Sequence, residues 1–254
     1  MNMRTMKWMA VAVLATWVVH ADEVNISAAA SLKECLNEII EAYGKKMPAT
    51  RIIPNYEASG KLQKQIENGA PVDLFISANQ DKMDAVEKKA LIKKGSRVNL
   101  LENQVVLIVP CATTNTIDSF AALGSDKLKA NGLAIGDPKV VPAGAYALEV
   151  LTFFKVKDQV LPKVVYAQNV RAVLAYVAQG EVDAGVVYLT DARVMKESVK
   201  IVATAPKGSH QPTIYPAAVV TTGSNAAGGE AFLAFLKGDV ATQIFIKYGF
   251  TKAP

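Results

Sequence analysis

Apolar residues alternate between strand-like and helix-like spacing along most of the chain. Between Ser31 and Tyr43 they recur three and four positions apart, which predicts an amphipathic helix, and a strand-length apolar stretch comes just before it. This strand-helix pairing then repeats, and such alternation favours a parallel sheet covered by helices on both faces. The elements expected in this part are strands at 23–27, 51–54 and 73–77 and helices at 31–43, 60–68 and 82–90.

A second series of the same kind begins after an almost continuous apolar strand at 104–109. Its expected strands are 133–136, 163–166 and 184–188, and its expected helices are 145–154 and 170–179. Another apolar strand, 215–221, is followed by two amphipathic helices, 226–236 and 240–248. Because these helices have no sheet of their own, we place them against the first lobe, so that the chain crosses between lobes twice, near residues 105 and 219.

The resulting prediction is an α/β fold of two similar lobes, each a mostly parallel sheet flanked by helices. Two crossover strands join the lobes and form a hinge. The first lobe comprises residues 22–104 plus 220–254, and the second comprises residues 105–219.

The first 21 residues have the pattern of a cleavable secretion signal. Arg4 and Lys7 precede a stretch of about a dozen apolar residues, and the segment ends in Val19-His20-Ala21. The apolar stretch is too short to span a bilayer, which takes roughly 20 residues. We therefore expect cleavage after Ala21 and a periplasmic product rather than a membrane-anchored one. The remaining 233 residues are enough for two lobes with separate cores.

Charge and cysteine content narrow the function further. The whole chain has a formal net charge of +5, and the leader carries two of the basic residues, so the remainder carries +3. That is too weak a positive charge to indicate nucleic-acid binding. Cys35 and Cys111 would meet an oxidising compartment, but a disulfide between them would join the two lobes and restrain the hinge, so two free thiols are favoured.

Four junctions between a strand and a helix, two in each expected lobe, are candidate anion-binding positions. Ser31 begins the S-x-x-E pattern of a helix capping box, and its hydroxyl retains one proton that an anion could accept. The other three junctions are Ser59-Gly60, Ala143-Gly144 and Val170-Arg171. Because helix N-termini in open α/β folds carry free N–H groups and a partial positive charge, these four could converge on a compact anion.

Residues for catalysis or for a metal cation are scarce. His210 is the one histidine beyond the predicted leader, and the glycine pattern fits no dinucleotide or phosphate loop. Carboxylates such as Asp137, Asp183 and Asp191 are not spaced as an acid/base pair, so structural roles at strand ends are favoured for them.

Seven blocks of the sequence, in order, resemble the periplasmic molybdate-binding proteins, which have the type II periplasmic binding protein fold. The resemblance covers essentially all of the chain after the leader, and although each block alone is weak, seven in register are specific. The blocks are AAASL (28–32), ASGKL through GAPVDLFISA (58–78), GDP with VPAGAYA (136–147), NVR (169–171), GVVY (185–188), YP (215–216) and FIKYGF (245–250).

The resemblance implies that Ser31 and Ser59 bind a tetrahedral oxyanion through their hydroxyls. It also implies backbone N–H donors at Ala143 and Val170 and a phenol donor at Tyr188, for which the sequence by itself favours a packing role. The resemblance further implies that the oxyanion is molybdate or tungstate, held through these residues with no direct ligand to the metal and no cofactor. The implied protein is a monomeric carrier, not an enzyme, that delivers its anion to the membrane permease of an ABC importer.

Glu57 departs from the family pattern, because many relatives have small or hydroxyl residues just before the second serine. A carboxylate pointing into a dry anion site would repel the ligand by several kcal/mol, so we expect Glu57 to face solvent. Two alternatives stay open: a binding protein for sulfate, phosphate or another small oxyanion, and a secreted enzyme that acts on a small anionic substrate.

Overall fold

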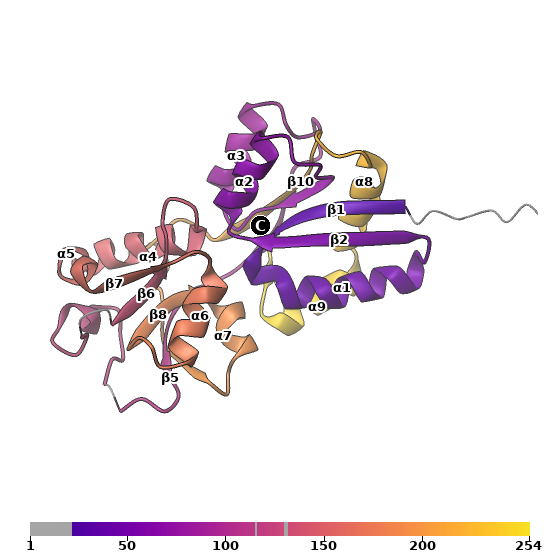
Figure 1. Ribbon diagram of the computed structural model, residues 1–254. Helices are drawn as coiled ribbons and strands as arrows, with labels where there is room; N and C mark the ends of the chain where they lie inside the picture. The colour runs from indigo at the N-terminus through magenta and orange to yellow at the C-terminus, as the bar shows by residue number, and fades with distance from the viewer. Residues whose placement is uncertain (1–21, 115, 130–131) are drawn as a thin grey trace, which may run out of the picture.

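The computed structural model describes residues 22–114, 116–129 and 132–254. The predicted secretion signal, residues 1–21, lies outside the described residues. Within them the chain forms two α/β lobes side by side, which confirms the predicted architecture (Figure 1).

The first lobe contains a six-stranded sheet in the order β11-β4-β10-β3-β1-β2. Its strands are β1 (Asp22–Ala29), β2 (Thr50–Glu57), β3 (Leu74–Ile76), β4 (Val98–Glu102), β10 (Ile214–Val219) and β11 (Thr251–Lys252). Its helices are the 3-10 turn η1 (Ala30–Leu32) and the α-helices α1 (Lys33–Lys46), α2 (Ser59–Glu67), α3 (Gln80–Lys88), α8 (Ala226–Leu236) and α9 (Asp239–Tyr248).

The second lobe contains a five-stranded sheet in the order β7-β6-β8-β5-β9. Its strands are β5 (Val105–Pro110), β6 (Leu133–Gly136), β7 (Val164–Ala167), β8 (Ala184–Tyr188) and β9 (Val199–Thr204). Its helices are α4 (Pro142–Phe153), α5 (Lys157–Val160), α6 (Val170–Ala178) and α7 (Leu189–Val194), with the short 3-10 turns η2 (Ala121–Gly124) and η3 (Leu161–Lys163).

Both sheets are mixed, whereas the sequence predicted mostly parallel ones. In the first lobe β1 pairs in parallel with β2 and β3, and β10 pairs antiparallel with β3 and β4. In the second lobe β6 pairs in parallel with β7 and β8, and β5 pairs antiparallel with β8 and β9. Strands β5 and β10 come directly after the crossings, where the chain enters each sheet from the other lobe, and the short β11 pairs antiparallel with β4 at the edge of the first sheet.

The structure moves one predicted lobe boundary. The chain leaves the first lobe between β4 and β5, at Asn103 and Gln104. It leaves the second after β9, and β10 already lies between β3 and β4 in the first sheet. The second lobe therefore ends before Ile214 and not at residue 219. The apolar pattern of this strand could not reveal the difference, because a strand buried in either sheet has the same composition.

The helical face predicted near the N-terminus is confirmed, since Cys35, Leu36, Ile39 and Tyr43 of α1 are all buried. Helices α8 and α9 pack on the first lobe: α8 lies against β1 and β10, and α9 lies against α1. Cys35 and Cys111 are both free thiols, the first buried and the second exposed. Among the described residues no helix is long and apolar enough to cross a membrane.

Candidate functional site

A small cavity lies where the two lobes meet. It is small, with about the room of one water molecule in this closed form. The first lobe contributes Ala29, Ala30, Ser31, Glu57, Ala58, Ser59 and Ala78, and the second contributes Val141, Pro142, Ala143, Val170 and Tyr188. All five residues that the sequence proposed as anion ligands therefore surround one cavity.

Each of the five is carried to the cavity by the end of a strand or the start of a helix. Ser31 lies in η1, directly after β1. Ser59 and Val170 are the first residues of α2 and α6, Ala143 is the second residue of α4, and Tyr188 ends β8. The first N–H groups of a helix have no partner within the helix, so α2, α4 and α6 direct free donors and the positive ends of their dipoles at this point.

Close approach of the lobes depends on glycine. The Gly60 N–H of α2 donates to the Val140 carbonyl of the second lobe at 2.9 Å. A Cβ at Gly60 would lie 2.6 Å from that same carbonyl oxygen and 2.7 Å from the Val140 Cα. At Gly144, within α4, a Cβ would lie 1.9 Å from the Gly136 carbonyl oxygen of β6. The first glycine permits contact between lobes, and the second permits the packing of α4 on β6.

Ser31 does not cap a helix, so the predicted capping box is wrong. Helix α1 begins at Lys33, its N-terminal cap is Leu32, and no side chain makes a capping hydrogen bond there. The 3-10 turn η1 displaces Ser31 from the capping position, and its hydroxyl lies 2.9 Å from the phenol oxygen of Tyr215 instead. Glu34, the other half of the expected box, forms an ion pair with Arg171.

The hydroxyls of Ser59 and Tyr188 are both buried at the cavity wall. Ser59 accepts the N–H of Ala78 at 2.9 Å, so its proton is left for another acceptor. Tyr188 is 1% exposed, and its hydroxyl has no hydrogen-bond partner of normal geometry among the described residues, although the Tyr215 phenol lies near enough to help raise its pKa. Burial raises the pKa of Tyr188 well above the ordinary value, so the phenol keeps its proton. An unpaired buried hydroxyl is unfavourable unless a ligand accepts from it.

Glu57 does not face solvent, and the sequence-based prediction on this point is wrong. Its side chain is 23% exposed and lines the cavity. One carboxylate oxygen accepts from the Ala58 N–H and from the Asn169 amide of the second lobe, both at 2.9 Å, and the other accepts from Lys61 at 3.0 Å. Although burial alone would raise the pKa of Glu57, these hydrogen bonds lower it. Through its hydrogen bond with Asn169, the Glu57 carboxylate joins the two lobes, and we call such a contact between lobes a clasp.

Arg171 forms a second clasp across the cleft, which the sequence analysis did not anticipate. From α6 it donates to the carbonyls of Ala30 and Ser31 in the first lobe, at 3.3 and 3.4 Å, and pairs with Glu34. In its own lobe it pairs with Asp191 at 2.9 Å. The sequence predicts a helix start at Asn169-Val170-Arg171. It does not show, however, in which direction an arginine side chain points.

The burial of Asp191 predicts a pH-dependent stability. It is fully buried, and desolvation raises its pKa from the ordinary 3.8 to about 6 in spite of Arg171. Because the folded state then holds this proton more tightly than the unfolded state, the contribution of Asp191 to stability is largest below about pH 4 and declines as the pH rises through 6. Each pKa unit corresponds to about 1.4 kcal/mol, so the change amounts to up to about 3 kcal/mol.

We therefore expect Asp191→Asn to remove this pH dependence. Chemical unfolding of the wild type and the variant between pH 4 and 7 measures it. The free energy of unfolding of the wild type should fall relative to that of Asp191→Asn as the pH rises. Parallel profiles for the two proteins would contradict the assignment.

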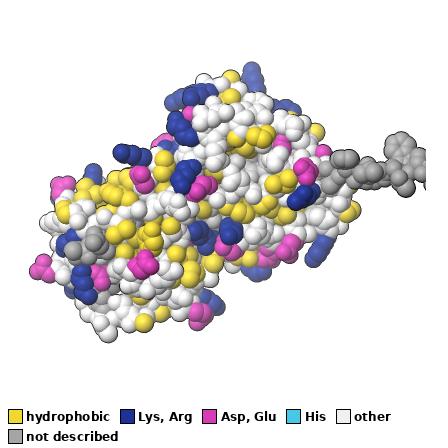
Figure 2. All heavy atoms as spheres, viewed as in Figure 1, with side chains coloured by type: hydrophobic (Ala, Val, Ile, Leu, Met, Phe, Trp, Pro, Cys, Tyr) yellow, Lys and Arg dark blue, Asp and Glu magenta, His cyan; other side chains and the backbone are white. Residues whose placement is uncertain are grey.

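The charges around the cavity differ from those of a cation site. Glu57 is the charged member of the cavity lining. In the described part of the chain, no three His, Cys, Asp or Glu residues are grouped so that they could hold a metal ion. In the view of Figure 2, basic side chains are interspersed with acidic ones over both lobes rather than gathered into one basic face. Neutral N–H and O–H groups are thus the donors that the cavity offers.

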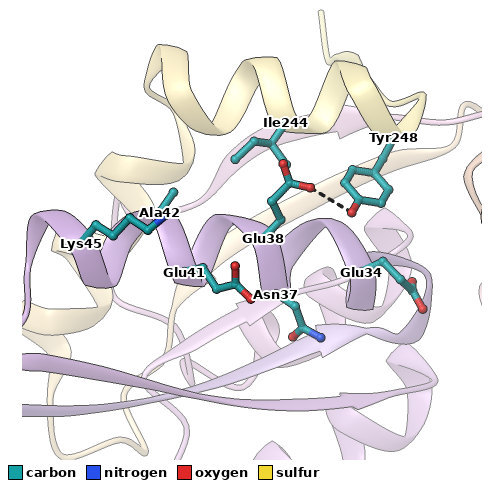
Figure 3. Close-up of a pocket in the computed structure, with 8 residues that line it drawn as sticks. All are labelled: Glu34, Asn37, Glu38, Glu41, Ala42, Lys45, Ile244 and Tyr248. Carbon is teal, nitrogen blue, oxygen red and sulfur yellow. Dashed lines mark hydrogen bonds between the residues drawn. The ribbon is translucent and has the colours of Figure 1, made fainter.

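A larger hollow on the first lobe does not suit an anion. It lies between α1 and α9 and is lined by Glu34, Glu38 and Glu41 among others (Figure 3). Glu38 accepts hydrogen bonds there from Tyr248 and Lys247. Three carboxylates on one helix face would repel an oxyanion, so we assign anion binding to the smaller cavity between the lobes.

Comparison with known proteins gives consistent matches over nearly the whole chain. Residues 24–251 match the family described as bacterial extracellular solute-binding protein. The molybdate-binding protein ModA of Escherichia coli (strain K12) is 44% identical over 91% of this chain and 90% of its own. The ModA protein of Haemophilus influenzae is 36% identical over 90% of each chain. The periplasmic molybdate-binding protein of Azotobacter vinelandii is similar in fold, with a TM-score of 0.79 over 91% of this chain and 100% of its own, at 22% identity.

Proposed function

The chain belongs to the bacterial extracellular solute-binding protein family, and from this premise we propose that it captures molybdate, or the closely similar tungstate, between its lobes and delivers it to an ABC importer. The observation that carries this proposal is the small cavity between the lobes, into which both lobes direct neutral donors. The identity of 44% and 36% to two molybdate-binding proteins supports the choice of anion.

In this proposal Ser31 and Ser59 donate their hydroxyl protons to the oxyanion. Ala143 and Val170 donate backbone N–H groups from the starts of α4 and α6. Tyr188 donates its phenol proton, which has no acceptor among the described residues. Each hydrogen bond to a charged acceptor contributes roughly 1.5 to 3 kcal/mol, so a few such donors give tight binding without a cation.

Capture proceeds by closure of the lobes on the anion. The anion first meets donors of one lobe, and rotation at the hinge brings the donors of the other lobe to it, replacing its water shell. The clasps Glu57–Asn169 and Arg171–Glu34 join the lobes once they are closed. Neutral donors favour release to the transporter as well, since a buried cation would hold the anion by a strong charge pair.

The remaining parts of the proposal concern the setting in which the protein works. It acts as a monomer in the periplasm, without a cofactor, and its partner is the membrane permease of the importer. It is a carrier and not an enzyme. Two carboxylates that an enzyme could use for catalysis, Asp137 and Asp183, do not line the cavity. Asp137 accepts from the backbone N–H of Lys139, and Asp183 accepts from that of Lys129.

Titration calorimetry on the protein without residues 1–21 tests the function. We expect saturable heat with molybdate and with tungstate at nanomolar to low-micromolar dissociation constants, and no heat with sulfate or phosphate. Heat with sulfate or phosphate, and none with molybdate or tungstate, would show that the ligand is another small oxyanion. Competition between molybdate and tungstate in one titration ranks the two.

The Ser59→Ala variant tests the site in the same experiment. Its lost hydroxyl should weaken molybdate binding at least tenfold, because the hydrogen bond is made to a charged acceptor. Ser125→Ala is the matched control, since the Ser125 hydroxyl donates to the Ala122 carbonyl in a loop of the second lobe. Equal molybdate affinities for both variants would show that the Ser59 hydroxyl does not bind the anion.

A further inference from the structure

A buried chain of hydrogen bonds leads from the connection between the lobes to Ser31. Asn103 lies in the first crossing, between β4 and β5, and is 5% exposed. Its side-chain amide nitrogen donates to the Tyr215 phenol oxygen at 3.2 Å and to the Thr190 hydroxyl at 2.9 Å. The Tyr215 oxygen in turn lies 2.9 Å from the Ser31 hydroxyl. All four residues of this chain are buried.

The orientation of the Asn103 amide is fixed by the backbone next to it. Its oxygen accepts the Gln104 N–H at 2.9 Å. Turning the amide over would bring its NH₂ group against that N–H, two donors facing each other, and would leave Tyr215 and Thr190 without their donor. The amide nitrogen therefore faces Tyr215, and Tyr215 must accept from it.

The direction of the next hydrogen bond follows from proton counting. The Tyr215 hydroxyl has one proton to donate. Of its two hydrogen-bond neighbours, Asn103 and Ser31, the Asn103 amide nitrogen cannot accept that proton. Ser31 can. If Ser31 donated to Tyr215 instead, the buried phenol proton would have no acceptor in this chain of contacts, which is costly. Burial raises the pKa of Tyr215 well above the ordinary value, so the proton remains on the phenol.

Ser31 thus accepts from Tyr215, and its own proton is free to point into the cavity. The Ser59 hydroxyl proton is also free for the cavity, because the Ser59 oxygen accepts the Ala78 N–H. Both serines are therefore held as donors before any ligand arrives. A serine without such a partner would rotate freely and would lose that freedom on binding.

We propose that Tyr215 and Asn103 are positioning residues that orient the Ser31 hydroxyl as a donor toward the bound oxyanion. They do so without touching the anion, since neither residue lines the cavity. The inference rests on the proposed function, in which Ser31 contacts molybdate. Because Asn103 lies in the crossing between lobes, this chain also connects the site to the hinge.

A double-mutant cycle with molybdate as the probe tests the positioning role. Calorimetry is performed on the wild type, Tyr215→Phe, Ser31→Ala and the double variant. We expect Tyr215→Phe to weaken molybdate binding about tenfold in the wild type and less than twofold when Ser31 is alanine. An equal loss in both backgrounds would overturn the proposal, because the phenol would then act through packing rather than through Ser31.

The same cycle separates failure of this inference from failure of the function. If the wild type binds no molybdate, or if Ser31→Ala binds as tightly as the wild type, the proposed function or its Ser31 contact fails first. Tyr56→Phe is the matched control, because it removes a phenol that donates to Asn37 at 2.7 Å outside the cavity. Thermal unfolding of each variant confirms that it is folded.

Asn103→Asp provides an independent test that keeps the shape of the side chain. A carboxylate cannot donate, so it would accept the Tyr215 proton, and Tyr215 would then accept from Ser31 and draw its proton away from the anion. We expect a loss of at least thirtyfold in the wild-type background and a clearly smaller loss in Ser31→Ala, where only the added negative charge acts. Unchanged affinity, or equal losses in the two backgrounds, would overturn the proposal.

Discussion

Gly60→Ala should weaken molybdate binding by at least a hundredfold while leaving the protein as stable as the wild type or more so. The added Cβ would lie 2.6 Å from the Val140 carbonyl oxygen, which is backbone of the opposite lobe and cannot turn aside. The lobes would have to stay apart, and the donors at Ala143, Val170 and Tyr188 would not reach an anion held by the first lobe. Loss of two or more such hydrogen bonds amounts to roughly 3 to 6 kcal/mol.

Stability should respond in the opposite direction because Gly60 lies in a helix. Alanine is better than glycine in a helix by roughly 0.5 to 1 kcal/mol, and Gly60 is the second residue of α2. The clash lies between lobes and not within one, so each lobe can fold undisturbed. A variant that is stable but binds poorly would identify lobe contact as the requirement.

Gly44→Ala is the matched control for this prediction. Gly44 lies in α1, and a Cβ there would meet no atom within 4 Å. It should gain the same helix stability and bind molybdate like the wild type in calorimetry, with melting temperatures recorded for both variants. If Gly60→Ala binds as tightly as Gly44→Ala, the contact between Gly60 and Val140 is not needed for capture.

Sequence predicted best where burial on one face gives a periodic signal. The expected elements at 133–136, 184–188 and 226–236 coincide with β6, β8 and α8. Strands β4 and β9 were missed. In β9, at the edge of its sheet, only Val199 is fully buried, and β4 is bordered on one side by just the two residues of β11. Weakly buried strands have little apolar pattern to detect.

The candidate site shows the same division between local and long-range information. Ser31, Ser59, Ala143 and Val170 are local features, because Ser31 directly follows a strand and the other three lie at helix starts, and the structure brings them together. Tyr188 came from the family resemblance alone. The roles of Glu57, Arg171 and Tyr215 depend on partners more than 100 positions away, such as Asn169 for Glu57 and Ser31 for Tyr215. Spacing along one sequence has no information about such pairs, which is why Glu57 was placed wrongly.

Tyr188→Phe should change binding and stability in opposite directions. With the lobes closed as in this structure, the Tyr188 hydroxyl is buried and has no partner of normal hydrogen-bond geometry among the described residues, which costs roughly 1 to 3 kcal/mol. Phenylalanine keeps the ring and its edge-to-face contact with Tyr215, 5.8 Å between centroids, and removes that cost. The unliganded variant should therefore unfold at a higher temperature than the wild type.

Molybdate binding by the same variant should weaken by roughly 10- to 150-fold, corresponding to 1.5 to 3 kcal/mol for a lost hydrogen bond to a charged acceptor. Melting curves with and without molybdate, together with calorimetry, measure both effects. Tyr248→Phe is the control, because its hydroxyl donates to Glu38 at 3.0 Å in the hollow between α1 and α9, away from the cavity, and it should bind molybdate normally without gaining stability. A Tyr188→Phe protein that is less stable and binds normally would make Tyr188 a packing residue, the role its position at a strand end first suggested. Higher stability with weaker binding requires that the hydroxyl be kept for the ligand, since a residue selected for packing would not retain a buried donor with nothing to accept from it.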